Sequence, residues 1–528
     1  MISTFKKEYI FILLIFFSSF FINWYFGFLA INPIDNFTNY NSGYLIFKGN
    51  LPFKDYWVTT GPLLDLFQFF FIKIIGLNWY SYVFQASILN SLFCCFLYFV
   101  FRKFDLDKNS SFFYSFITGF IFYSQLGTPF VDHHSSLFSI VSVLIFILAI
   151  NFNNKILYIL LPLFLLLGFL SKQTPVAYFA ILISFLIFYN FLIRKNYTSI
   201  ILLSISSLCL VLLLSSIFIY NGIKFTDFYY QYIKFASSVG EARIDSESFL
   251  KPITFSRYFL KFKWLHLSYL FLMVIIIKTI VQNKNFLTSK DFVSIFALIA
   301  SAYIFIIHQL LTLNVKFIYF FIPILGAFSH IYLNKITFSK TKIFKFINIF
   351  IVITGTVYYF GSYVYKQKFQ LYCLNKNKHL SPVSTKIIDN KSSFKWINCL
   401  HEDANQEINE LESVINYLNI NEKENYFLVT DYQFINSRLA NENQIQINKW
   451  YHPGVSYPLR DNANYQYFKN YVLNKIKKKQ IKSVIFIYPS HFGFENQIYF
   501  EEMFESCISN KSSRLNGIIQ LINIEKCY

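Results

Sequence analysis

The chain contains few charged residues for its length. Of 528 residues, only 14% are charged, whereas 55% are hydrophobic and 21% are aromatic. The mean hydropathy is +0.43. A soluble protein does not combine so little charge with so much apolar surface. The sequence therefore predicts a membrane protein.

Several common signatures of function are also missing. The polar part after residue 366 contains no glycine-rich phosphate loop and no nucleophile elbow. Acids are scarce before it: residues 1–366 hold 12 Asp/Glu and 28 Lys/Arg, whereas residues 367–528 hold 16 and 19. The basic residues of the apolar part are scattered between apolar runs. They suit loops that face anionic lipid headgroups and argue against a nucleic-acid surface.

Cysteine is sparse as well, with seven residues in the chain. Three of them, Cys94, Cys95 and Cys209, lie in apolar runs, where cysteine behaves as a small hydrophobe. The other four follow no zinc-binding spacing. In an oxidising compartment they allow two disulfides, and the alternative is four free thiols. The four residues, in the order of the two pairs, are Cys373 with Cys399 and Cys507 with Cys527.

Long apolar runs fill the first 366 residues. A helix needs about 20 apolar residues to cross a bilayer core of about 30 Å. Residues 62–76 differ, because they begin with Pro62 and read as a helix lying along the membrane interface. The chain predicts eleven spans: 9–31, 79–101, 111–124, 136–150, 156–170, 175–193, 199–220, 264–281, 292–313, 317–333 and 346–365.

The distribution of Lys and Arg predicts an orientation. The first span is too long for a signal peptide and lacks a small-residue cleavage site, so we expect it to remain uncleaved. With the amino terminus in the cytoplasm, most short basic loops lie inside, as the positive-inside rule requires. The segments 33–62, 125–135 and 221–263 then become outside loops. The part after residue 366 becomes periplasmic if the membrane is a bacterial inner membrane.

Residues 367–528 have the composition of a soluble domain. Residues 405–418 and 468–479 have helical spacing, and residues 426–430 and 483–488 are short apolar runs of buried-strand length. Strands that alternate with helices indicate a small α/β domain. The predicted fold is therefore a polytopic helical membrane domain, 1–366, followed by a soluble periplasmic α/β domain, 367–528.

Ionisable and polar residues gather on the predicted outer side. Such residues at membrane depth are expensive and tend to be functional. A carboxylate there can act as a general base, and lysines can bind the phosphate of an activated lipid-linked sugar. The candidates, in chain order, are Asp35, Asp55, Asp132, His133, His134, Lys172, Gln173, Arg243, His308 and Lys316.

Each candidate also has a structural explanation. Asp35 could cap a helix that begins at Asn36, Asp55 could cap a turn after Pro52, and Asp132 could cap the fourth span. The basic residues Lys172, Arg243 and Lys316 could extend to lipid headgroups, and His308 could be a buried bundle histidine. Asp132, His133 and His134 could bind a metal, but adjacent helical residues point apart, so we rank sugar or acceptor binding higher. We predict no metal and no other cofactor, although a divalent ion is compatible with this cluster.

The order of motifs resembles a known family. An Asp follows the first span, and a Gly then precedes Pro-aromatic-x-Asp and a Pro-initiated interfacial helix. A further acid lies in the second outside loop, and a basic residue, an aromatic and a proline mark a late span. The matching residues are Asp35, Gly49, Pro52-Phe53-Lys54-Asp55, Gly61-Pro62, Asp132, Lys316, Tyr319 and Pro323. Residues 1–366 thereby resemble GT-C-type glycosyltransferases, in particular the protein O-mannosyltransferase and lipid A aminoarabinose transferase group.

The resemblance implies an outside-facing site that uses a polyprenyl-phosphate-linked sugar, with Asp35 as the base and inversion at the anomeric carbon. Several members of the group carry a Lys before the interfacial helix that is thought to hold the lipid phosphate. Thr60-Gly61 occupies that place here. The phosphate would then be bound elsewhere, with Lys172, Lys316 and Arg243 as the candidates.

We therefore expect an inner-membrane glycosyltransferase that transfers a sugar from a polyprenyl-phosphate donor to a lipid, glycan or protein acceptor. Asp35 would accept the acceptor proton, and Asp132 would position the acceptor or share the base role. One alternative is a transporter or flippase of lipid-linked glycans, which predicts charged residues deep in the spans and an internal repeat. Another is a membrane anchor for the carboxy-terminal domain.

Overall fold

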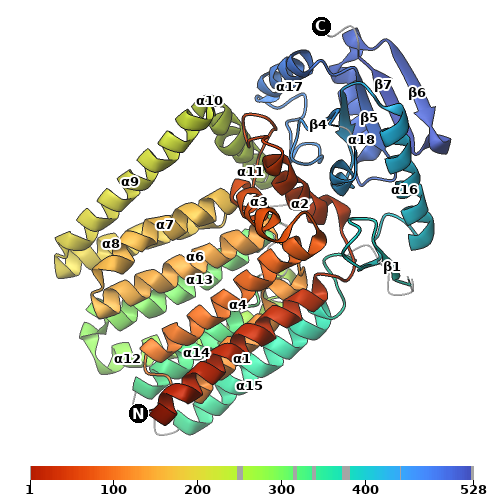
Figure 1. The fold of residues 1–528 in the computed structure, drawn as a ribbon. Helices are drawn as coiled ribbons and strands as arrows, with labels where there is room; N and C mark the ends of the chain where they lie inside the picture. The colour runs from red at the N-terminus through yellow and green to blue at the C-terminus, as the bar shows by residue number, and fades with distance from the viewer. Residues whose placement is uncertain are drawn as a thin grey trace. The chain divides into compact units, whose positions relative to one another are not determined.

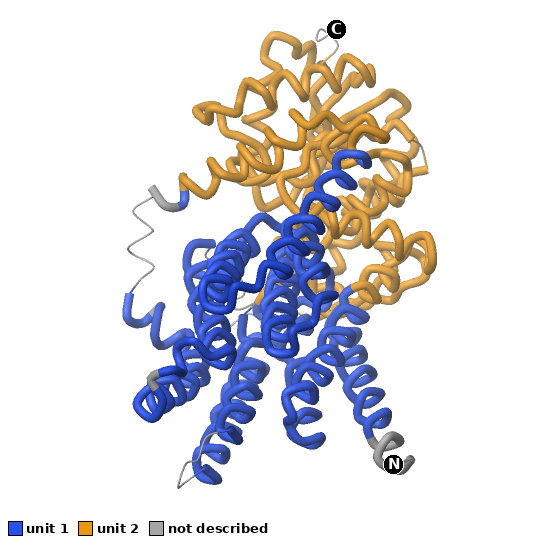
Figure 2. The backbone as a smooth tube through the Cα atoms, turned by 90° about the vertical axis from the view of Figure 1, so that its left-hand side faces the viewer, with its two compact units in different colours: residues 1–27, 86–217, 243–368 blue, residues 28–85, 218–242, 369–528 orange. Residues whose placement is uncertain are grey.

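A computed structural model describes residues 2–245, 254–312, 318–335, 341–371, 381–440 and 442–524. They form two compact units, each assembled from three separate segments of the chain (Figure 2). The first unit contains residues 1–27, 86–217 and 243–368. The second contains residues 28–85, 218–242 and 369–528. The predicted boundary at residue 366 lies close to the last division between the two units, after residue 368.

The first unit consists of helices that run alongside one another (Figure 1). Its closely packed pairs include α6 with α7, α1 with α5, and α12 with α14. The α-helices, two of which extend across a unit boundary, are α1 (Ile2–Phe26), α4 (Trp79–Lys103), α5 (Lys108–Ile121), α6 (Val131–Phe152), α7 (Lys155–Ser171), α8 (Val176–Arg194), α9 (Tyr197–Asn221), α12 (Lys263–Gln282), α13 (Lys290–Thr312), α14 (Phe321–Lys335) and α15 (Thr341–Tyr359). Short 3-10 or π turns accompany them: η1 (Tyr123–Gln125), η3 (Ser256–Leu260), η4 (Lys284–Thr288) and η5 (Phe360–Val364).

Eight helices of the described residues are long and apolar enough to cross a membrane. They are α1 from Glu8, α4, α6, α8, α9, α12, α13, and α15 with its continuation through η5 to Val364. The sequence predicted eleven spans. The other three, at 111–124, 156–170 and 317–333, correspond to α5, α7 and α14, which have only 14, 17 and 15 residues. The structure confirms a helical protein with several apolar helices of membrane-spanning length, and the predicted count of eleven spans stays a prediction.

The three segments expected as outside loops are largely helical. Residues 33–62 contain α2 (Pro33–Phe47) and end at the start of α3 (Pro62–Ile75). The segment 125–135 ends inside α6, and residues 225–245 form α10 (Phe225–Phe228), the π turn η2 (Tyr229–Lys234) and α11 (Phe235–Asp245). Both α2 and α3 begin at a proline, whose fixed φ suits the first helical turn. The polar side chains of α2 do not mark a solvated loop, because most of them are buried: Asn36, Thr38, Asn39, Asn41 and Ser42.

The second unit contains a five-stranded mixed sheet with the order β4-β3-β5-β7-β6. Strand β3 lies parallel to β4 and β5, whereas β7 is antiparallel to both β5 and β6. The strands are β3 (Tyr426–Val429), β4 (Gln444–Ile445), β5 (Ser483–Ile487), β6 (Asn510–Arg514) and β7 (Ile519–Asn523). A separate antiparallel pair joins β1 (Val383–Thr385) and β2 (Phe394–Trp396).

Three helices accompany this sheet, and the predicted α/β character of the carboxy-terminal part is confirmed. The predicted helices 405–418 and 468–479 correspond to α16 (Ala404–Asn421) and α17 (Tyr465–Lys479), and α18 (Gly493–Met503) was not predicted. The predicted strands 426–430 and 483–488 correspond to β3 and β5. Short 3-10 turns complete the unit: η6 (Gln433–Ser437), η7 (Glu505–Cys507) and η8 (Leu515–Gly517).

The segment before α3 packs within this second unit. The Trp57 ring is fully buried and lies 5.0 Å from the Phe468 ring and 5.5 Å from the Tyr471 ring, measured between centroids. The backbone N–H of Trp57 donates to Ile447 O at 2.7 Å, and the N–H of Lys449 donates to Trp57 O at 2.9 Å. The stretch that the sequence marked as a site is thus part of the core of the sheet-containing unit.

The described cysteines fall into two groups. Cys94, Cys95 and Cys209 are free thiols. Cys399 and Cys507 are each disulfide-bonded, which excludes the alternative of free thiols at these two positions. Their predicted partners, Cys373 and Cys527, lie outside the described residues.

Candidate functional site

A buried ionic cluster lies at helix ends in the first unit. Asp132 lies in the first turn of α6, and the side chain of Lys172, which follows α7, donates to both its oxygens, at 2.7 Å and 2.9 Å. His308 of α13 places Nε2 3.4 Å from Asp132 Oδ1. The side chains of Asp132 and His308 are 2% and 1% exposed, whereas that of Lys172 is 14% exposed. We call these three residues the Asp132 cluster.

Local packing holds the Asp132 cluster in place. Helices α6 and α7 form an antiparallel pair, and α13 packs against α6 and α8. Ser135, one turn after Asp132, donates from Oγ to the backbone carbonyl of Lys172 at 3.1 Å. The Arg243 guanidinium interacts electrostatically with Asp132, which opposes the effect of burial that lowers the pKa of Arg243. With His308 neutral, the three residues and Arg243 carry one net positive formal charge.

The two histidines after Asp132 do not join it. His133 Nε2 lies 3.1 Å from Phe122 O, and the His133 ring lies 4.9 Å from the Tyr123 ring. His134 Nδ1 lies 3.2 Å from Phe130 O and shares a hydrogen bond with the Tyr123 hydroxyl. Neighbouring residues of a helix point in different directions. Among the described residues, no group of three or more His, Cys, Asp or Glu side chains could hold a metal ion.

Asp35 lies in the second unit, in the first turn of α2, and is half-buried. Asn32, the N-cap residue, donates from Nδ2 to Asp35 Oδ2 at 2.9 Å, and its backbone N–H donates to Asn36 Oδ1 at 2.7 Å. Helix α2 begins at Pro33, so the expected cap position moves from Asp35 to Asn32. Asn32 therefore helps to orient the Asp35 carboxylate.

Asp55 has a structural role in a turn of the same unit. Its Oδ2 accepts a hydrogen bond from the backbone N–H of Leu51 at 2.9 Å. Lys475 lies 3.4 Å from Asp55 Oδ1 and donates to the backbone carbonyl of Lys54 at 2.6 Å. Burial lowers the pKa of Lys475, and Asp55 opposes that shift. These contacts agree with the turn-capping alternative for Asp55.

The sequence analysis did not single out Asp65, which is fully buried in α3. Lys449 donates to Asp65 Oδ1 at 2.6 Å, and the Tyr56 hydroxyl donates to Oδ2 at 3.2 Å. Lys449 also donates to the carbonyls of Thr60 at 2.9 Å and Gly61 at 3.1 Å. Burial raises the pKa of Asp65 to about 6, although Lys449 lowers it. The sequence feature that could have identified Asp65 is a single acid within an apolar helix, in the stretch Leu-Leu-Asp-Leu-Phe.

Lys449 thus occupies the neighbourhood of Thr60-Gly61, where the resembling family would place a lysine. Its side chain is 1% exposed and is bound by a carboxylate and two carbonyls. Burial lowers its pKa against the effect of Asp65. Lys449 therefore stabilises the second unit and offers no accessible charge to a phosphate.

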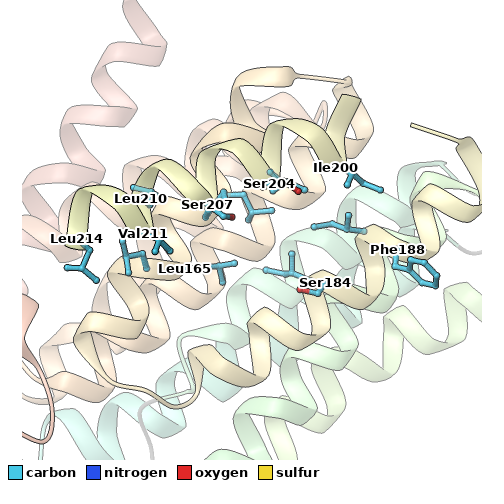
Figure 3. A pocket seen from close by; sticks show the side chains of 15 residues that line it. Leu165, Ser184, Phe188, Ile200, Ser204, Ser207, Leu210, Val211 and Leu214 are labelled. Carbon is cyan, nitrogen blue, oxygen red and sulfur yellow. The ribbon is translucent and has the colours of Figure 1, made fainter. Parts of the chain in front are cut away.

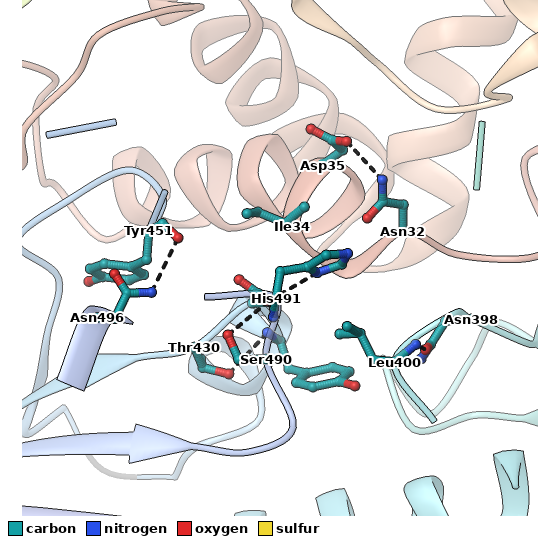
Figure 4. A network of polar contacts seen from close by, with 12 residues as sticks. Asn32, Ile34, Asp35, Asn398, Leu400, Thr430, Tyr451, Ser490, His491 and Asn496 are labelled. Atoms are coloured by element: carbon teal, nitrogen blue, oxygen red, sulfur yellow. Dashed lines mark hydrogen bonds and ion pairs between the residues drawn. The ribbon is translucent and has the colours of Figure 1, made fainter. Parts of the chain in front are cut away.

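A second acid that the sequence analysis did not single out, Asp431, follows β3 in the second unit, and Figure 4 shows its partners Ser490 and His491. Its Oδ2 accepts hydrogen bonds from Ser490 Oγ at 2.9 Å and from the backbone N–H of His491 at 2.7 Å. The His491 Nδ1 lies 3.3 Å from the same oxygen. No linear motif marks this cluster, because residues far apart in the sequence follow two adjacent strands.

The remaining candidates have simpler positions. Gln173 is half-buried in the turn between α7 and α8, where its carbonyl accepts a hydrogen bond from Ala177 N at 3.1 Å. Lys316 lies outside the described residues. The structure therefore brings Asp132, Lys172 and His308 together in the first unit. Asp35 and Asp55 belong to the second.

An apolar pocket of about 460 Å³ lies between α7, α8 and α9 of the first unit (Figure 3). Leucine, isoleucine, valine and phenylalanine side chains provide most of its wall, and Ser184, Ser204 and Ser207 are its polar residues. Its wall is suited to a hydrocarbon chain.

Comparison with models of protein families and with curated protein sequences finds no match to this chain.

Proposed function

We propose that the protein is a membrane glycosyltransferase that moves a sugar from a polyprenyl-phosphate donor to an acceptor, with inversion at the anomeric carbon. The observation that carries the proposal is the Asp35 carboxylate, half-buried in the first turn of α2 and oriented by Asn32. A carboxylate in this position can act as a general base toward an acceptor hydroxyl or amine. The order of motifs around Asp35 supports the same assignment.

The proposed reaction is a direct displacement. Asp35 takes the proton from an acceptor hydroxyl or amine as that atom attacks the anomeric carbon. The bond between the anomeric carbon and the phosphate oxygen breaks, and the electron pair leaves with the polyprenyl phosphate. The products are the glycosylated acceptor and the lipid phosphate, with the proton held on Asp35. Asp132 retains the predicted role of positioning the acceptor or sharing the base function.

The donor phosphate is assigned to basic residues of the first unit. The Asp132 cluster together with Arg243 carries a net positive formal charge in an apolar helical unit, where an anion is favoured. Lys172 is partly exposed and could exchange one carboxylate hydrogen bond for a phosphate oxygen. Lys316 remains the third predicted contributor.

A lipid-linked donor also needs room for its hydrocarbon chain. The apolar pocket between α7, α8 and α9 could provide this room. Only 6% of the apolar stretch of α9 is buried inside the structure, so most of this helix would face lipid. An isoprenoid chain seated there would contact leucine and isoleucine side chains while it remained continuous with the bilayer.

We propose eleven spans, with the amino terminus in the cytoplasm of a bacterial cell and the carboxy-terminal domain in the periplasm. Neighbouring helices can shield the three shorter helices α5, α7 and α14 within the bilayer. The disulfide-bonded state of Cys399 and Cys507 supports an oxidising compartment for the carboxy-terminal part.

The test of this function is single-turnover transfer. Purified full-length protein is mixed with a radiolabelled undecaprenyl-phosphate sugar and crude cell-envelope lipids, and label in the product is measured. We expect Asp35→Asn to lower the transfer rate by about 10²- to 10⁴-fold, the usual effect of losing a general base. Asp461→Asn is the matched control, because Asp461 is exposed in the same unit. Equal transfer by the wild type and Asp35→Asn refutes the assignment.

A second series separates the phosphate role from the base role. We expect Lys172→Met to weaken donor binding and to raise KM for the donor. Asp291→Asn is the control, because Asp291 makes a 2.8 Å ion pair with Lys335 in the same unit and both side chains are about one-third or more exposed. An unchanged KM in Lys172→Met would remove this residue from the phosphate site.

A transporter or flippase of lipid-linked glycans remains the second candidate. One observation favours it: Asp132 in the first turn of α6 and His308 of α13 form a polar contact between two membrane-length helices. Proteoliposomes containing the purified protein and a fluorescent polyprenyl-phosphate sugar distinguish the two functions. Movement of label between leaflets without its release from the lipid supports the transporter. Release that depends on Asp35 supports the enzyme.

A further inference from the structure

The second unit contains a polar site that lies at the carboxyl ends of two parallel strands. Asp431 follows β3, and Ser490 and His491 follow β5. Because β3 and β5 are parallel neighbours, the segments that follow them leave the sheet at the same edge. Open sheets with parallel strands bind ligands outside this edge.

The Asp431 carboxylate is held there with one oxygen that lacks a hydrogen-bond partner among the described residues. The residue is 2% exposed, and Oδ2 accepts from Ser490 Oγ, His491 N and, at 3.3 Å, His491 Nδ1. Oδ1 is buried and has no hydrogen-bond partner in the described residues. A buried acceptor without a donor costs free energy, which a hydroxyl group from a ligand would recover.

In Figure 4 the first turn of α2 is drawn beside these residues, with Ile34 toward His491 and the Asp35 carboxylate on the far side of the helix. Contacts along α2 fix the arrangement. Phe37 and Phe434 have ring centroids 4.7 Å apart. Helix α2 also packs against η6, which begins two residues after Asp431. Helix α2 and the segment after β3 therefore form one corner of the second unit.

Aromatic rings extend from His491 along one side of this corner. The His491 and Phe492 ring centroids are 6.3 Å apart, and Phe492 stacks on His452 at 4.0 Å. Trp450 lies 5.7 Å from His452 in an edge-to-face arrangement. All four side chains are partly exposed, so ring surface is available to a ligand.

We propose that this corner binds a sugar ring of the acceptor. We call it the strand-end site and define it as Asp431, Ser490, His491 and Phe492. Sugar hydroxyls would donate to Asp431 Oδ1, and the apolar face of the pyranose would pack on the Phe492 ring. The inference rests on the proposed function, because it takes the bound sugar to be part of the transferase's acceptor. It narrows the acceptor to a glycan or a glycolipid.

A cation is the less suitable occupant. Among the described residues no cluster supplies three or more His, Cys, Asp or Glu ligands, and Asp431 Oδ2 is already engaged with Ser490 and His491. Partly exposed aromatic rings contribute nothing to the oxygen coordination that Ca²⁺ or Mg²⁺ prefers. They do suit the amphipathic surface of a sugar.

Binding to the full-length protein tests the inference. The protein is reconstituted in phospholipid nanodiscs, because sugar-headed detergents would compete for the site. The probes are methyl α-D-mannopyranoside, methyl β-D-glucopyranoside and methyl β-D-galactopyranoside, followed by saturation-transfer NMR and tryptophan fluorescence. We expect saturable binding of at least one probe, weakened about tenfold by Asp431→Asn and by Phe492→Ala, the loss of about one good contact.

Two matched substitutions control for non-specific effects. Asp461→Asn changes an exposed acid of the same unit, and Phe494→Ala removes a ring that is 68% exposed two residues from Phe492. Both should bind the probe as the wild type does. Thermal unfolding checks that each variant folds. If Asp431→Asn does not fold, Phe492→Ala decides the outcome, because its ring is partly exposed.

Three results overturn the inference. The first is no binding of any of the three probes, and the second is that Asp431→Asn and Phe492→Ala both bind the probe as tightly as the wild type does. The third is binding of Ca²⁺ or Mn²⁺ that depends on Asp431 and does not change when sugar is added. The outcome is separable from that of the proposed function. Sugar binding without glycosyl transfer refutes only the transferase. Transfer without binding at the strand-end site refutes only the acceptor assignment.

Discussion

The Asp65–Lys449 ion pair should dominate the stability of the second unit. Lys449 Nζ lies 2.6 Å from Asp65 Oδ1, and the side chains are 1% and 0% exposed. Removing one partner of a buried pair leaves an uncompensated charge and costs about 3–5 kcal/mol. For a unit of this size, about 1 kcal/mol lowers Tm by about 2–4 °C. We therefore expect Lys449→Met to lower the Tm of the second unit by about 6–20 °C.

The double variant Asp65→Asn/Lys449→Met gives the sharper measurement. Removing both charges ends the unpaired-charge penalty, and the remaining loss is the hydrogen bonds that Lys449 donates to the carbonyls of Thr60 and Gly61. Leaving buried acceptors unsatisfied costs about 1–3 kcal/mol. We expect the double variant to unfold at a higher temperature than Lys449→Met alone. Thermal scans in nanodiscs, followed by tryptophan fluorescence, measure all variants under one scan rate.

The matched control is the Lys48–Glu442 pair of the same unit. Its charges lie 2.7 Å apart, but the side chains are 40% and 82% exposed. Because water screens exposed pairs, we expect Lys48→Met to change Tm far less than Lys449→Met. Two results would show that burial of the pair does not control stability. One is that Lys48→Met and Lys449→Met lower Tm equally, and the other is that the Tm decrease of the double variant equals the sum of the decreases of Asp65→Asn and Lys449→Met.

The loss of stability caused by Lys449→Met should depend on pH, and the direction follows from the pKa of Asp65. Burial raises the pKa of Asp65 to about 6 even beside Lys449, above the unfolded value of about 3.9. A raised carboxyl pKa stabilises the fold at low pH and loses that contribution as the pH rises through the folded pKa. Lys449→Met removes the charge that lowers the pKa of Asp65, so its Tm deficit should shrink between pH 8 and pH 5. A deficit that grows on acidification contradicts this reasoning.

Two further measurements test packing and covalent links in the second unit. A Cβ at Gly43 of α2 would lie 2.3 Å from Gln68 Cγ of α3, so Gly43→Ala should destabilise the fold by about 1–3 kcal/mol, whereas Gly240→Ala, with no heavy atom within 4 Å, should be neutral or slightly stabilising. Reduction should lower the Tm, because Cys399 and Cys507 are disulfide-bonded and each link contributes about 2–4 kcal/mol. An unchanged Tm after complete thiol labelling would contradict that expectation.

The carboxy-terminal elements were predictable because their signals are local. Helix α16 has helical periodicity, a capping Asp403 and a buried face, and β3 and β5 are short apolar runs with burial at every position. Helix α2 gave the opposite signal. The sequence analysis placed it in an outside loop, whereas most of its polar side chains are buried. One of them, Asn41, hydrogen-bonds with Gln433 and Asn436, about 390 positions later. A periodicity argument cannot detect partners at that separation.

The candidate site shows the same limit. The sequence suggested Asp132 and Lys172, and the structure joins them within one unit. It did not suggest Asp65, Asp431 or Lys449, because their partners are supplied by distant segments. Isolated acids in apolar surroundings were the usable signal. Composition alone could not reveal which of them form buried ion pairs.

The buried ion pairs Asp132–Lys172 of the first unit and Asp65–Lys449 of the second unit differ in whether their lysine can bind a ligand. Lys172 is 14% exposed and Lys449 is 1% exposed, and Lys449 also donates to two carbonyls. Only Lys172 can exchange its carboxylate for an incoming anion without opening the fold. We therefore expect an amine-acylating reagent to modify Lys172 faster than Lys449, as measured by peptide mass spectrometry. Undecaprenyl phosphate should protect Lys172 and leave Lys449 unaffected; equal rates, or no protection, would mean that Lys172 is as structural as Lys449.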